Sequence, residues 1–415
     1  MDSESARNIT VCVIGLGYVG FPLAEAFSHH VKTIGYDNDT EKIRLITNSN
    51  PPFFATNNPE EIKNADYIMI CVPTPVTMTK QADLSFVSAA AAIAGKYLKH
   101  GATVVLESTV YPGVTEEIVK PILEKESGMK CGEGFRIGYS PERINPGDAE
   151  NVLSKITKIV AGMDENTLAD LVDLYGLITN VYRSKNIQTA EAAKVIENIQ
   201  RDLNIALMNE LALIFHHLGI DTKDVLEAAG SKWNFLRFSP GLVGGHCIPV
   251  DPYYLVARAQ EFDYHPQVIL AGRAINDSMP KYVAMMAIEG INSVGKVIKG
   301  SKVLIMGLTY KENVADIRES PAVEIIQELK HFGISVYGFD PLLTEETISK
   351  FGVLNYHDNM GKVDAIIIAV AHNQFRTMTI NHFKDFMNEH PVLIDVRRMI
   401  ICEEAERVGI HYKGL

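Results

Sequence analysis

A glycine-rich segment with one thiol and one carboxylate is the strongest candidate for chemistry in this chain. Residues 238–255 read FSPGLVGGHCIPVDPYYL, which places Cys247 four residues before Asp251. Gly241 and Gly244 permit backbone conformations that are closed to other residues, so a ligand can approach the chain closely there. A cysteine in such a loop can act as a nucleophile when its pKa is lowered or a base removes its proton. The alternative at this point is a buried structural cysteine, because free cysteines are among the most buried residues.

A second set of polar side chains lies on a long predicted helix. Residues 188–218 lack Pro and Gly, which predicts one continuous helix of about 45 Å. Glu191, Lys194, Asn198 and Arg201 recur every three or four residues, so we expect them on one face. Lys194 could stabilise an oxyanion and Asn198 could hold a water or a hydroxyl group, although a solvated surface stripe is the alternative. We expect the opposite, apolar face to pack through Ile196, Leu203, Leu207 and Leu211.

The start of the chain has the pattern of a dinucleotide-binding unit. An apolar run at residues 9–14 predicts a strand, the turn Gly15-Leu16-Gly17-Tyr18-Val19-Gly20 follows, and a helix is expected at residues 21–29. A second predicted strand, residues 31–36, ends at Asp37. A GxGxxG pattern alone is weak evidence. Between a strand and a helix, with an acidic residue at this distance, it indicates a Rossmann unit.

Each glycine of this turn has a distinct expected role. Gly15 allows the tight turn, Gly17 lets a pyrophosphate approach, and Gly20 lets the helix pack against the strand, where the helix amides face the phosphate charge. Asp37 would accept hydrogen bonds from a ribose diol and repel a 2′-phosphate, so the sequence favours NAD over NADP. A glycine-rich turn without a ligand is the alternative.

Three further strands are predicted at residues 65–72, 103–107 and 136–139. Ligands of parallel sheets lie beyond the carboxyl ends of the strands. The polar residues that follow these strands are therefore expected around the nicotinamide, although each could instead be a turn or cap residue: Thr74, Thr109, Glu142, Arg143 and Asn145.

The last third of the chain repeats the first without its glycines. Strands are predicted at residues 302–306, 334–339, 364–370 and 391–396, with a helix at residues 321–331. The second of these strands ends in Gly-Phe-Asp-Pro, which matches the Gly-Tyr-Asp-Asn that ends at residue 38. The turn at residues 307–320 offers Lys311 and Arg318 to a phosphate in place of GxGxxG, unless these are ordinary surface cations.

Length and composition limit the class of protein. A chain of 415 residues needs two or three domains, for which we expect residues 1–187, 188–295 and 296–415. With 39 basic and 51 acidic residues the net charge is −12, which argues against a nucleic-acid partner.

Five scattered cysteines without a CxxC pair suggest neither a disulfide framework nor a metal site. No signal peptide and no bilayer-length apolar run is visible, so a cytoplasmic protein is expected. The apolar surface of the helical region, which includes a predicted helical stretch at residues 264–291, predicts a homodimer.

Seven motifs along the chain resemble those of one family. GLGYVG, VPTP, ESTVYPG, YSPER, AAKVIEN, GGHCIPVD and GLTYKENVADIRESP occur in the order seen in the nucleotide-sugar 6-dehydrogenases, the UDP-glucose/GDP-mannose dehydrogenase family. The GGHCIPVDPYY loop resembles the branch that acts on UDP-N-acetylhexosamines (GlcNAc, ManNAc or GalNAc). The resemblance implies two Rossmann-like α/β domains joined by a long helix, and a four-electron oxidation of a sugar CH2OH that uses two NAD⁺.

The resemblance also implies roles for single residues. Cys247 would attack the C6 aldehyde, and the resulting thiohemiacetal would be oxidised to a thioester that water hydrolyses. Lys194 and Asn198 would stabilise the alkoxide, and Asp251 would act as a base or orient water. Thr109 and Glu142 would order water, and Arg318 would lie near the cofactor. The residues implied at the substrate are Glu142, Arg143, Asn145, Lys194, Asn198, Arg201, Gly241, Gly244, Lys311 and Arg398.

Three other functions are compatible with the sequence. The first is oxidation of UDP-glucose. The second is a single-step NAD-dependent alcohol or hydroxy-acid dehydrogenase that uses Lys194 without the thiol. The third is a nucleotide-sugar sensor without activity, which the intact Lys194, Asn198, Cys247 and Asp251 set argues against.

Overall fold

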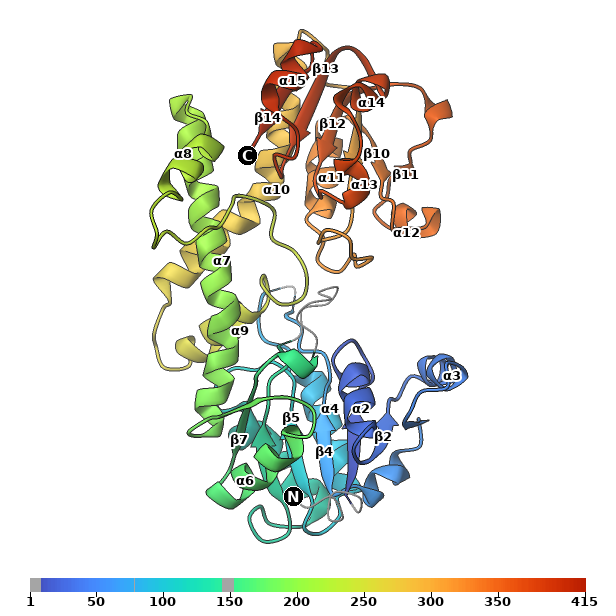
Figure 1. Ribbon diagram of the computed structural model, residues 1–415, viewed down its shortest axis with the longest axis vertical. Coiled ribbons are helices and arrows are strands. Elements are labelled where there is room, and N and C mark those ends of the chain that lie inside the picture. The colour runs from blue at the N-terminus through green and yellow to red at the C-terminus, as the bar shows by residue number, and fades with distance from the viewer. Residues whose placement is uncertain (1–8, 78, 144–152) are drawn as a thin grey trace. The chain divides into compact units, whose positions relative to one another are not determined.

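The computed structural model describes residues 9–77, 79–143 and 153–415, and they divide into two compact units (Figure 1). The first unit contains the chain up to Asn198 together with Val250–His265, and the second contains Ile199–Pro249 together with Pro266–Leu415. Helix α7 (Ile187–Leu218) begins in the first unit and ends in the second. The three-domain division expected from the sequence stays a prediction.

The first unit is built on a mostly parallel sheet. Among the described residues the strand order is β3-β2-β1-β4-β5-β6-β7-β8, and only the β6–β7 pair is antiparallel. The order 3-2-1-4-5-6 is that of a Rossmann fold. The strands of this unit are β1 (Thr10–Ile14), β2 (Lys32–Tyr36), β3 (Phe54–Thr56), β4 (Tyr67–Ile70), β5 (Thr103–Leu106), β6 (Arg136–Tyr139), β7 (Lys158–Gly162) and β8 (Val181–Arg183).

Helices cover both faces of this sheet because its side chains alternate. Cys12 and Ile14 of β1 face one apolar cluster, with α4 and the start of α7, whereas Val11 and Val13 face another, with α2 and α6. The helices of this unit, besides α7, are α2 (Gly20–Ser28), α3 (Thr40–Asn48), η1 (Pro59–Asn64), α4 (Ser85–Lys96), η2 (Thr115–Val119), α5 (Lys120–Ser127), η3 (Leu153–Lys155), α6 (Glu165–Tyr175) and α9 (Asp251–Gln260).

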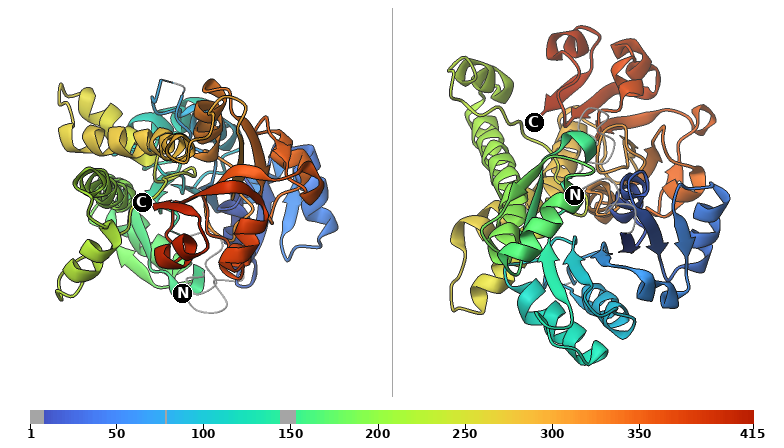
Figure 2. Two further views of the ribbon diagram at one scale, coloured as in Figure 1. Left: turned by 90° about the horizontal axis from the view of Figure 1, so that it is seen from above. Right: turned by 60° about the horizontal axis from the view of Figure 1, so that its bottom comes forward.

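The second unit contains a second parallel sheet, drawn in orange to red in Figure 2, and the first sheet is drawn in blue to green. Its order among the described residues, β11-β10-β9-β12-β13-β14, again places the first strand of the unit in the middle. The strands are β9 (Lys302–Met306), β10 (Ser335–Phe339), β11 (Leu354–Asn355), β12 (Val363–Ile368), β13 (Met387–Asp395) and β14 (His411–Gly414). The predicted strands of both halves are therefore confirmed.

The second sheet also separates two apolar clusters. Val303 and Ile305 of β9 pack with α10 and α11, whereas Leu304 and Met306 pack with α14 and α15. The helices of this unit are α8 (Thr222–Ala229), α10 (Gln267–Ser293), α11 (Ala322–His331), α12 (Glu345–Ser349), η4 (Asp358–Met360), α13 (Asn373–Arg376), α14 (Ile380–Asp385) and α15 (Cys402–Arg407). Within the described ranges no helix is long and apolar enough to cross a membrane.

Helix α7 buries three of the four residues of its expected polar face, which corrects one expectation. Ile196 and Leu207, expected to pack, are 53% and 49% exposed. Glu191, Lys194 and Asn198 are buried instead. The reason is that Glu191 and Asn198 have hydrogen-bond partners inside the fold, which compensate their burial, and that the charge of Lys194 acts on the Asp251 carboxyl group.

Candidate active site

The turn after β1 fits a dinucleotide. Gly15 has φ +92°, and a Cβ there would lie 2.6 Å from the carbonyl oxygen of Cys71. A Cβ on Gly20 would lie 1.9 Å from the Gly15 oxygen, so both positions require glycine. A Cβ on Gly17 would meet no atom within 4 Å, which leaves open space where a pyrophosphate can approach the backbone. Leu16, Tyr18 and Val19 complete this turn, and α2 begins at Gly20.

Asp37 stands at the carboxyl end of β2, at the position expected for the ribose ligand. Its carboxylate accepts hydrogen bonds from the N–H groups of Leu16 (2.9 Å) and Asp39 (3.0 Å) and pairs with Lys42 (2.9 Å). Burial alone would raise the pKa of Asp37, but the hydrogen bonds from Lys42 and the two backbone N–H groups keep this pKa below its usual value. The group is therefore ionised at neutral pH and accepts hydrogen bonds only.

The ends of β5 and β6 carry a buried ionic group that sequence reasoning missed. Glu107, directly after β5, is fully buried and pairs with Lys158 at 2.7 Å. The Tyr175 hydroxyl also donates to Glu107. Glu142 lies 3.9 Å from the same ammonium group. These contacts fix the loops after β5 and β6, on which Thr109 and Glu142 lie, and no local sequence pattern indicated that Lys158 would be buried.

The other residues predicted at strand ends fall where expected along the chain. Thr74 follows β4 and Thr109 follows β5. Arg143 follows β6, and its guanidinium pairs with Glu197 of α7 at 2.6 Å and donates to the Thr157 carbonyl oxygen. Asn145 lies outside the described residues.

Lys194, Asn198 and Asp251 form a buried cluster where α7 meets the start of α9. The Asn198 amide donates to Asp251 at 2.5 Å, and all three side chains are less than 10% exposed. Burial raises the pKa of Asp251 to about 6, and Lys194 and Asn198 oppose this increase. A carboxyl group with a pKa near neutrality can exchange a proton at working pH, which suits a general base. Arg201, expected on the same face, is exposed.

Glu191, one turn before Lys194, ties α7 to the loop after β5. Its carboxylate accepts hydrogen bonds from the N–H groups of Gly113 (2.6 Å) and Thr115 (3.0 Å) and from the Thr115 hydroxyl (2.7 Å). Burial raises the pKa of Glu191 to about 7 despite these hydrogen bonds. The ESTVYPG loop is thus held by the helix that carries Lys194 and Asn198.

In the second unit, a clamp holds the beginning of the cysteine loop. The Asn209 amide of α7 accepts from the Gly241 N–H at 2.8 Å and donates to the Gly241 carbonyl oxygen at 3.0 Å. Asn209 also donates to Asn276 of α10, which donates in turn to Asp202. Asp202 pairs with the buried Arg273 at 2.6 Å. This buried chain of contacts fixes Gly241, and its members lie too far apart in the sequence to be recognised as a unit.

The cysteine loop makes a second close contact just before Cys247, at Gly244 and Gly245. A Cβ on Gly244 would lie 2.7 Å from the Glu319 oxygen, and one on Gly245 would lie 2.6 Å from the Tyr310 ring. Burial and Asp316 raise the pKa of Tyr310, with a smaller contribution from the half-buried Cys247, which follows Gly245 by two residues. The glycines let the loop pack directly on the segment that follows β9.

A cavity of about 280 Å³ opens next to Tyr310, at the carboxyl ends of β9 and β12. Lys311 and Arg397 line it together with Glu312, which pairs with Arg397 at 3.1 Å. Lys311 was predicted as a substrate residue, whereas Arg397 was not. Two cations at the switch point of a parallel sheet suit a phosphorylated ligand.

Arg398 and Arg318 have other contacts. Arg398 pairs with Asp221, the residue that caps α8, and it lines two neighbouring cavities rather than the one with Lys311. Arg318 pairs with Asp316 at 2.5 Å in the turn after β9. No cluster of three His, Cys, Asp or Glu suited to a metal ion occurs within the described parts of the chain.

A Rossmann unit with an acidic residue after β2, and a second doubly wound unit with a cation-lined cavity, define a nucleotide-dependent dehydrogenase. Family models agree. Residues 48–179 match the NAD binding domain of the UDP-glucose/GDP-mannose dehydrogenase family, residues 188–278 its central domain, and residues 304–401 its UDP binding domain. The chain belongs to this family, as the motifs predicted, and is an NAD-dependent oxidoreductase of UDP-sugars.

Relatives are similar over nearly the whole chain. Protein CapL of Staphylococcus aureus is 44% identical over 96% of this chain and 97% of its own length. A UDP-N-acetyl-D-glucosamine 6-dehydrogenase of Salmonella typhi is 43% identical over 96% and 98%. Among solved structures, the UDP-D-ManNAc dehydrogenase of Pyrococcus horikoshii superposes with a TM-score of 0.87 at 28% identity, covering 98% of this chain and 99% of that one.

Proposed function

We propose that this protein oxidises the C6 hydroxyl group of a UDP-N-acetylhexosamine, with UDP-GlcNAc as the first candidate, to the carboxylate. The observation that carries the proposal is the glycine-rich loop of Cys247, in which Gly244 and Gly245 pack against Pro321 and Tyr310 in the wall of the Lys311 cavity. The sugar is favoured by the relatives named UDP-N-acetyl-D-glucosamine 6-dehydrogenase, at 43% identity, over those named for the mannosamine substrate, at 31%. UDP-glucose remains the alternative substrate.

The proposed route has two oxidations. NAD⁺, when bound, accepts the hydride that leaves C6 in each of them, and its pyrophosphate and ribose would be held by the turn at Gly15–Gly20 and by Asp37. In the first oxidation Asp251 accepts the hydroxyl proton as the alcohol becomes an aldehyde, and Lys194 and Asn198 stabilise the negative charge on the oxygen.

The second oxidation uses the thiol. The Cys247 sulfur adds to the aldehyde carbon and forms a thiohemiacetal, whose oxidation leaves a thioester. Water, ordered by Thr109 and Glu142, then cleaves the C–S bond and releases the carboxylate and the free thiol. Covalent capture divides a hard oxidation into two steps and retains the aldehyde.

The cavity residues provide for the nucleotide end of the substrate. Lys311 and Arg397 are suited to the diphosphate, because both line the cavity and Arg can bind phosphate oxygens in pairs. Other residues stay predictions. Arg398 is predicted to bind the UDP phosphates or the sugar, and Thr74 and Arg318 to bind the cofactor. The predicted substrate contacts are Glu142, Arg143, Arg201, Gly241 and Gly244.

The same proposal includes a homodimer. Helix α7 exposes Ile196, Leu207 and Ile214, and such a row of apolar side chains along one helix is typical of an interface. A cytoplasmic location stays a prediction from the sequence. Sedimentation equilibrium tests the assembly, and a monomer at micromolar concentration would refute the dimer.

The stoichiometry of NADH tests the function. Wild-type protein should form two NADH per sugar with UDP-GlcNAc, measured beside UDP-ManNAc, UDP-GalNAc and UDP-glucose. Cys247→Ser should form NADH slowly and accumulate aldehyde or a covalent adduct. Four-electron turnover by Cys247→Ser would refute the nucleophile, and one NADH per sugar in the wild type would favour a single-step dehydrogenase. Binding of UDP-sugar without any NADH would favour a sensor.

A further inference from the structure

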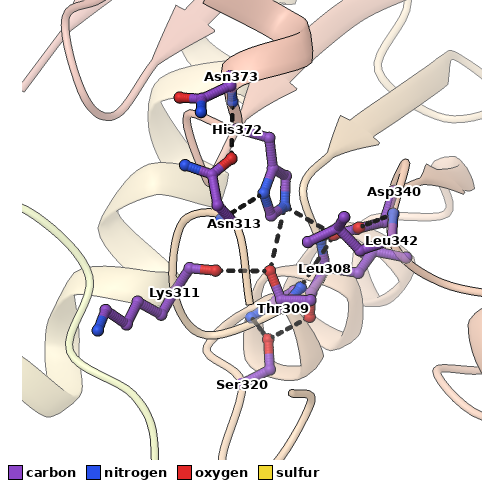
Figure 3. A network of polar contacts seen from close by, with 10 residues as sticks. Leu308, Thr309, Lys311, Asn313, Ser320, Asp340, Leu342, His372 and Asn373 are labelled. Atoms are coloured by element: carbon purple, nitrogen blue, oxygen red, sulfur yellow. Dashed lines mark hydrogen bonds and ion pairs between the residues drawn. The ribbon is translucent and has the colours of Figure 1, made fainter. Parts of the chain in front are cut away.

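The second unit contains a buried imidazole that the proposed mechanism does not use. His372 lies after β12 and is 1% exposed. Its Nδ1 lies 2.9 Å from the Asn313 backbone nitrogen, and its Nε2 lies 3.1 Å from both the Thr309 hydroxyl and an Asp340 oxygen (Figure 3). Three segments that are far apart in the sequence therefore meet at one ring.

These contacts define which nitrogen carries the proton. A backbone N–H can only donate, so Nδ1 must accept from Asn313 and carry no proton. The Thr309 hydroxyl donates to the Lys311 carbonyl oxygen at 3.0 Å, so it accepts at its other side. Nε2 therefore bears the hydrogen, which it shares between Thr309 and Asp340. The neutral ring with the proton on Nε2 satisfies every contact.

The imidazole gives the acidic residue of the second unit a contact that its counterpart in the first unit lacks. Asp340 occupies in the second unit the position that Asp37 has in the first, and each accepts the N–H of the residue after the turn glycine, from Leu308 at 2.7 Å and from Leu16 at 2.9 Å. Asp340 additionally accepts from the Thr309 N–H and meets His372. The acidic residue of the second unit thus anchors a loop through the imidazole.

The anchored loop is the one that carries Lys311. The segment is tied at both ends, through Thr309 and through Asn313, and the Asn313 side-chain oxygen also accepts from the Asn373 N–H at 2.9 Å. Asn313 has φ +59°, the left-handed conformation that asparagine tolerates better than most residues other than glycine. Figure 3 shows the Lys311 side chain extending away from the imidazole, and Lys311 lines the cavity.

We propose that His372 is a positioning residue for substrate binding. Through its unprotonated Nδ1 it holds the Asn313 end of the 309–313 loop and so keeps Lys311 at the cavity wall. This inference rests on the proposed binding of the UDP part of the substrate in that cavity. His372 itself touches no reacting atom.

Two substitutions separate the two ring nitrogens. In His372→Asn the side-chain oxygen can occupy the place of Nδ1 and still accept from Asn313. In His372→Gln the longer amide reaches the place of Nε2 and leaves the Asn313 N–H without an acceptor. Both remove the imidazole, so a loss of stability common to the two reports the packing role alone. Calorimetric binding of UDP and steady-state kinetics are measured on wild type and both variants.

The expected result is a difference between the variants. His372→Gln should raise the UDP dissociation constant and the KM for UDP-sugar about tenfold, the factor that corresponds to about 1.4 kcal/mol, with kcat and the KM for NAD⁺ unchanged. His372→Asn should stay within about twofold of wild type. Equal effects of the two variants, whether large or absent, would overturn the role of Nδ1.

Two observations on the wild type complete the test. Failure of the wild type to bind UDP would refute the assignment of the cavity, and with it this inference, whereas binding by wild type with equal variants refutes only the role of His372. The ¹⁵N spectrum of histidine-labelled wild type should show His372 with an unprotonated Nδ1. A protonated Nδ1 would refute the inference even if neither variant folds.

Discussion

Substituting Asp251 by Asn should make the protein more stable and less active at once. The carboxylate is 3% exposed and its pKa is raised from 3.8 to about 6, because burial outweighs the opposing effects of Lys194 and Asn198. Ionising this group therefore costs free energy in the folded state. Asparagine has the same shape without the charge, so Asp251→Asn resembles the protonated carboxyl group and avoids that cost.

The size and the sign follow from the two pKa values. A difference from 3.8 to about 6, at about 1.36 kcal/mol per pH unit, corresponds to about 3 kcal/mol. The folded protein binds the proton of Asp251 more tightly than the unfolded chain does. The contribution of this proton to the free energy of unfolding is therefore fully present below about pH 4 and is lost as the pH rises through about 6. Above that pH the contribution no longer changes.

The assay is unfolding by denaturant at pH 5 and pH 8 for wild type, Asp251→Asn and Asp385→Asn, a matched control with an exposed carboxylate at the end of α14. The advantage of Asp251→Asn over wild type should be larger by about 1.5 kcal/mol at pH 8 than at pH 5, with no such change in the control. Turnover should fall by about 10²-fold or more if Asp251 is the base. An advantage that is equal at the two pH values would refute the reasoning.

Three further substitutions have defined outcomes. Asp37→Ala should raise the dissociation constant for NAD⁺ and reduce discrimination against NADP⁺; unchanged NAD⁺ affinity would exclude Asp37 as the ribose ligand. Lys158→Met leaves the buried Glu107 without its cation, which should lower the unfolding free energy by about 3–5 kcal/mol in denaturant titrations. A loss below about 1 kcal/mol would contradict the buried pair. Asn209→Ala removes both hydrogen bonds to Gly241 and should increase aldehyde release per NADH formed, measured with a trapping reagent; an unchanged ratio would show that the clamp does not position the cysteine loop.

Local sequence patterns were sufficient to predict those elements whose structure depends on residues close together in the sequence. The strand–GxGxxG–helix pattern at residues 9–29 predicted β1 and α2, because alternation and turn chemistry act within a few residues. The echo of the Asp37 segment at Asp340 predicted the second doubly wound unit for the same reason. The N-cap of α8 is equally local, because the Asp221 carboxylate accepts hydrogen bonds from two backbone N–H groups at the start of that helix.

The polar face of α7 shows where such patterns fail. Polarity alone suggested that Ile196 and Leu207 pack and that the opposite face is a stripe of side chains with Arg201 in line. The fold buries Glu191 and Asn198 instead, because the loop after β5 and the start of α9 supply their hydrogen-bond partners. The sequence of a helix shows which side chains are polar. It does not show which distant groups will become their hydrogen-bond partners.

By itself the sequence determined the two nucleotide-type units, the NAD preference and the family, since each depends on residue types at short fixed spacings. Only the tertiary structure decided that Arg397 lines the same cavity as Lys311. It also decided that Asn209 accepts a hydrogen bond from the Gly241 N–H and that His372 accepts one from the Asn313 N–H. These pairs join segments separated by 32 to 86 residues along the chain, and the physical reason is that hydrogen-bond and charge partners are selected by proximity after folding.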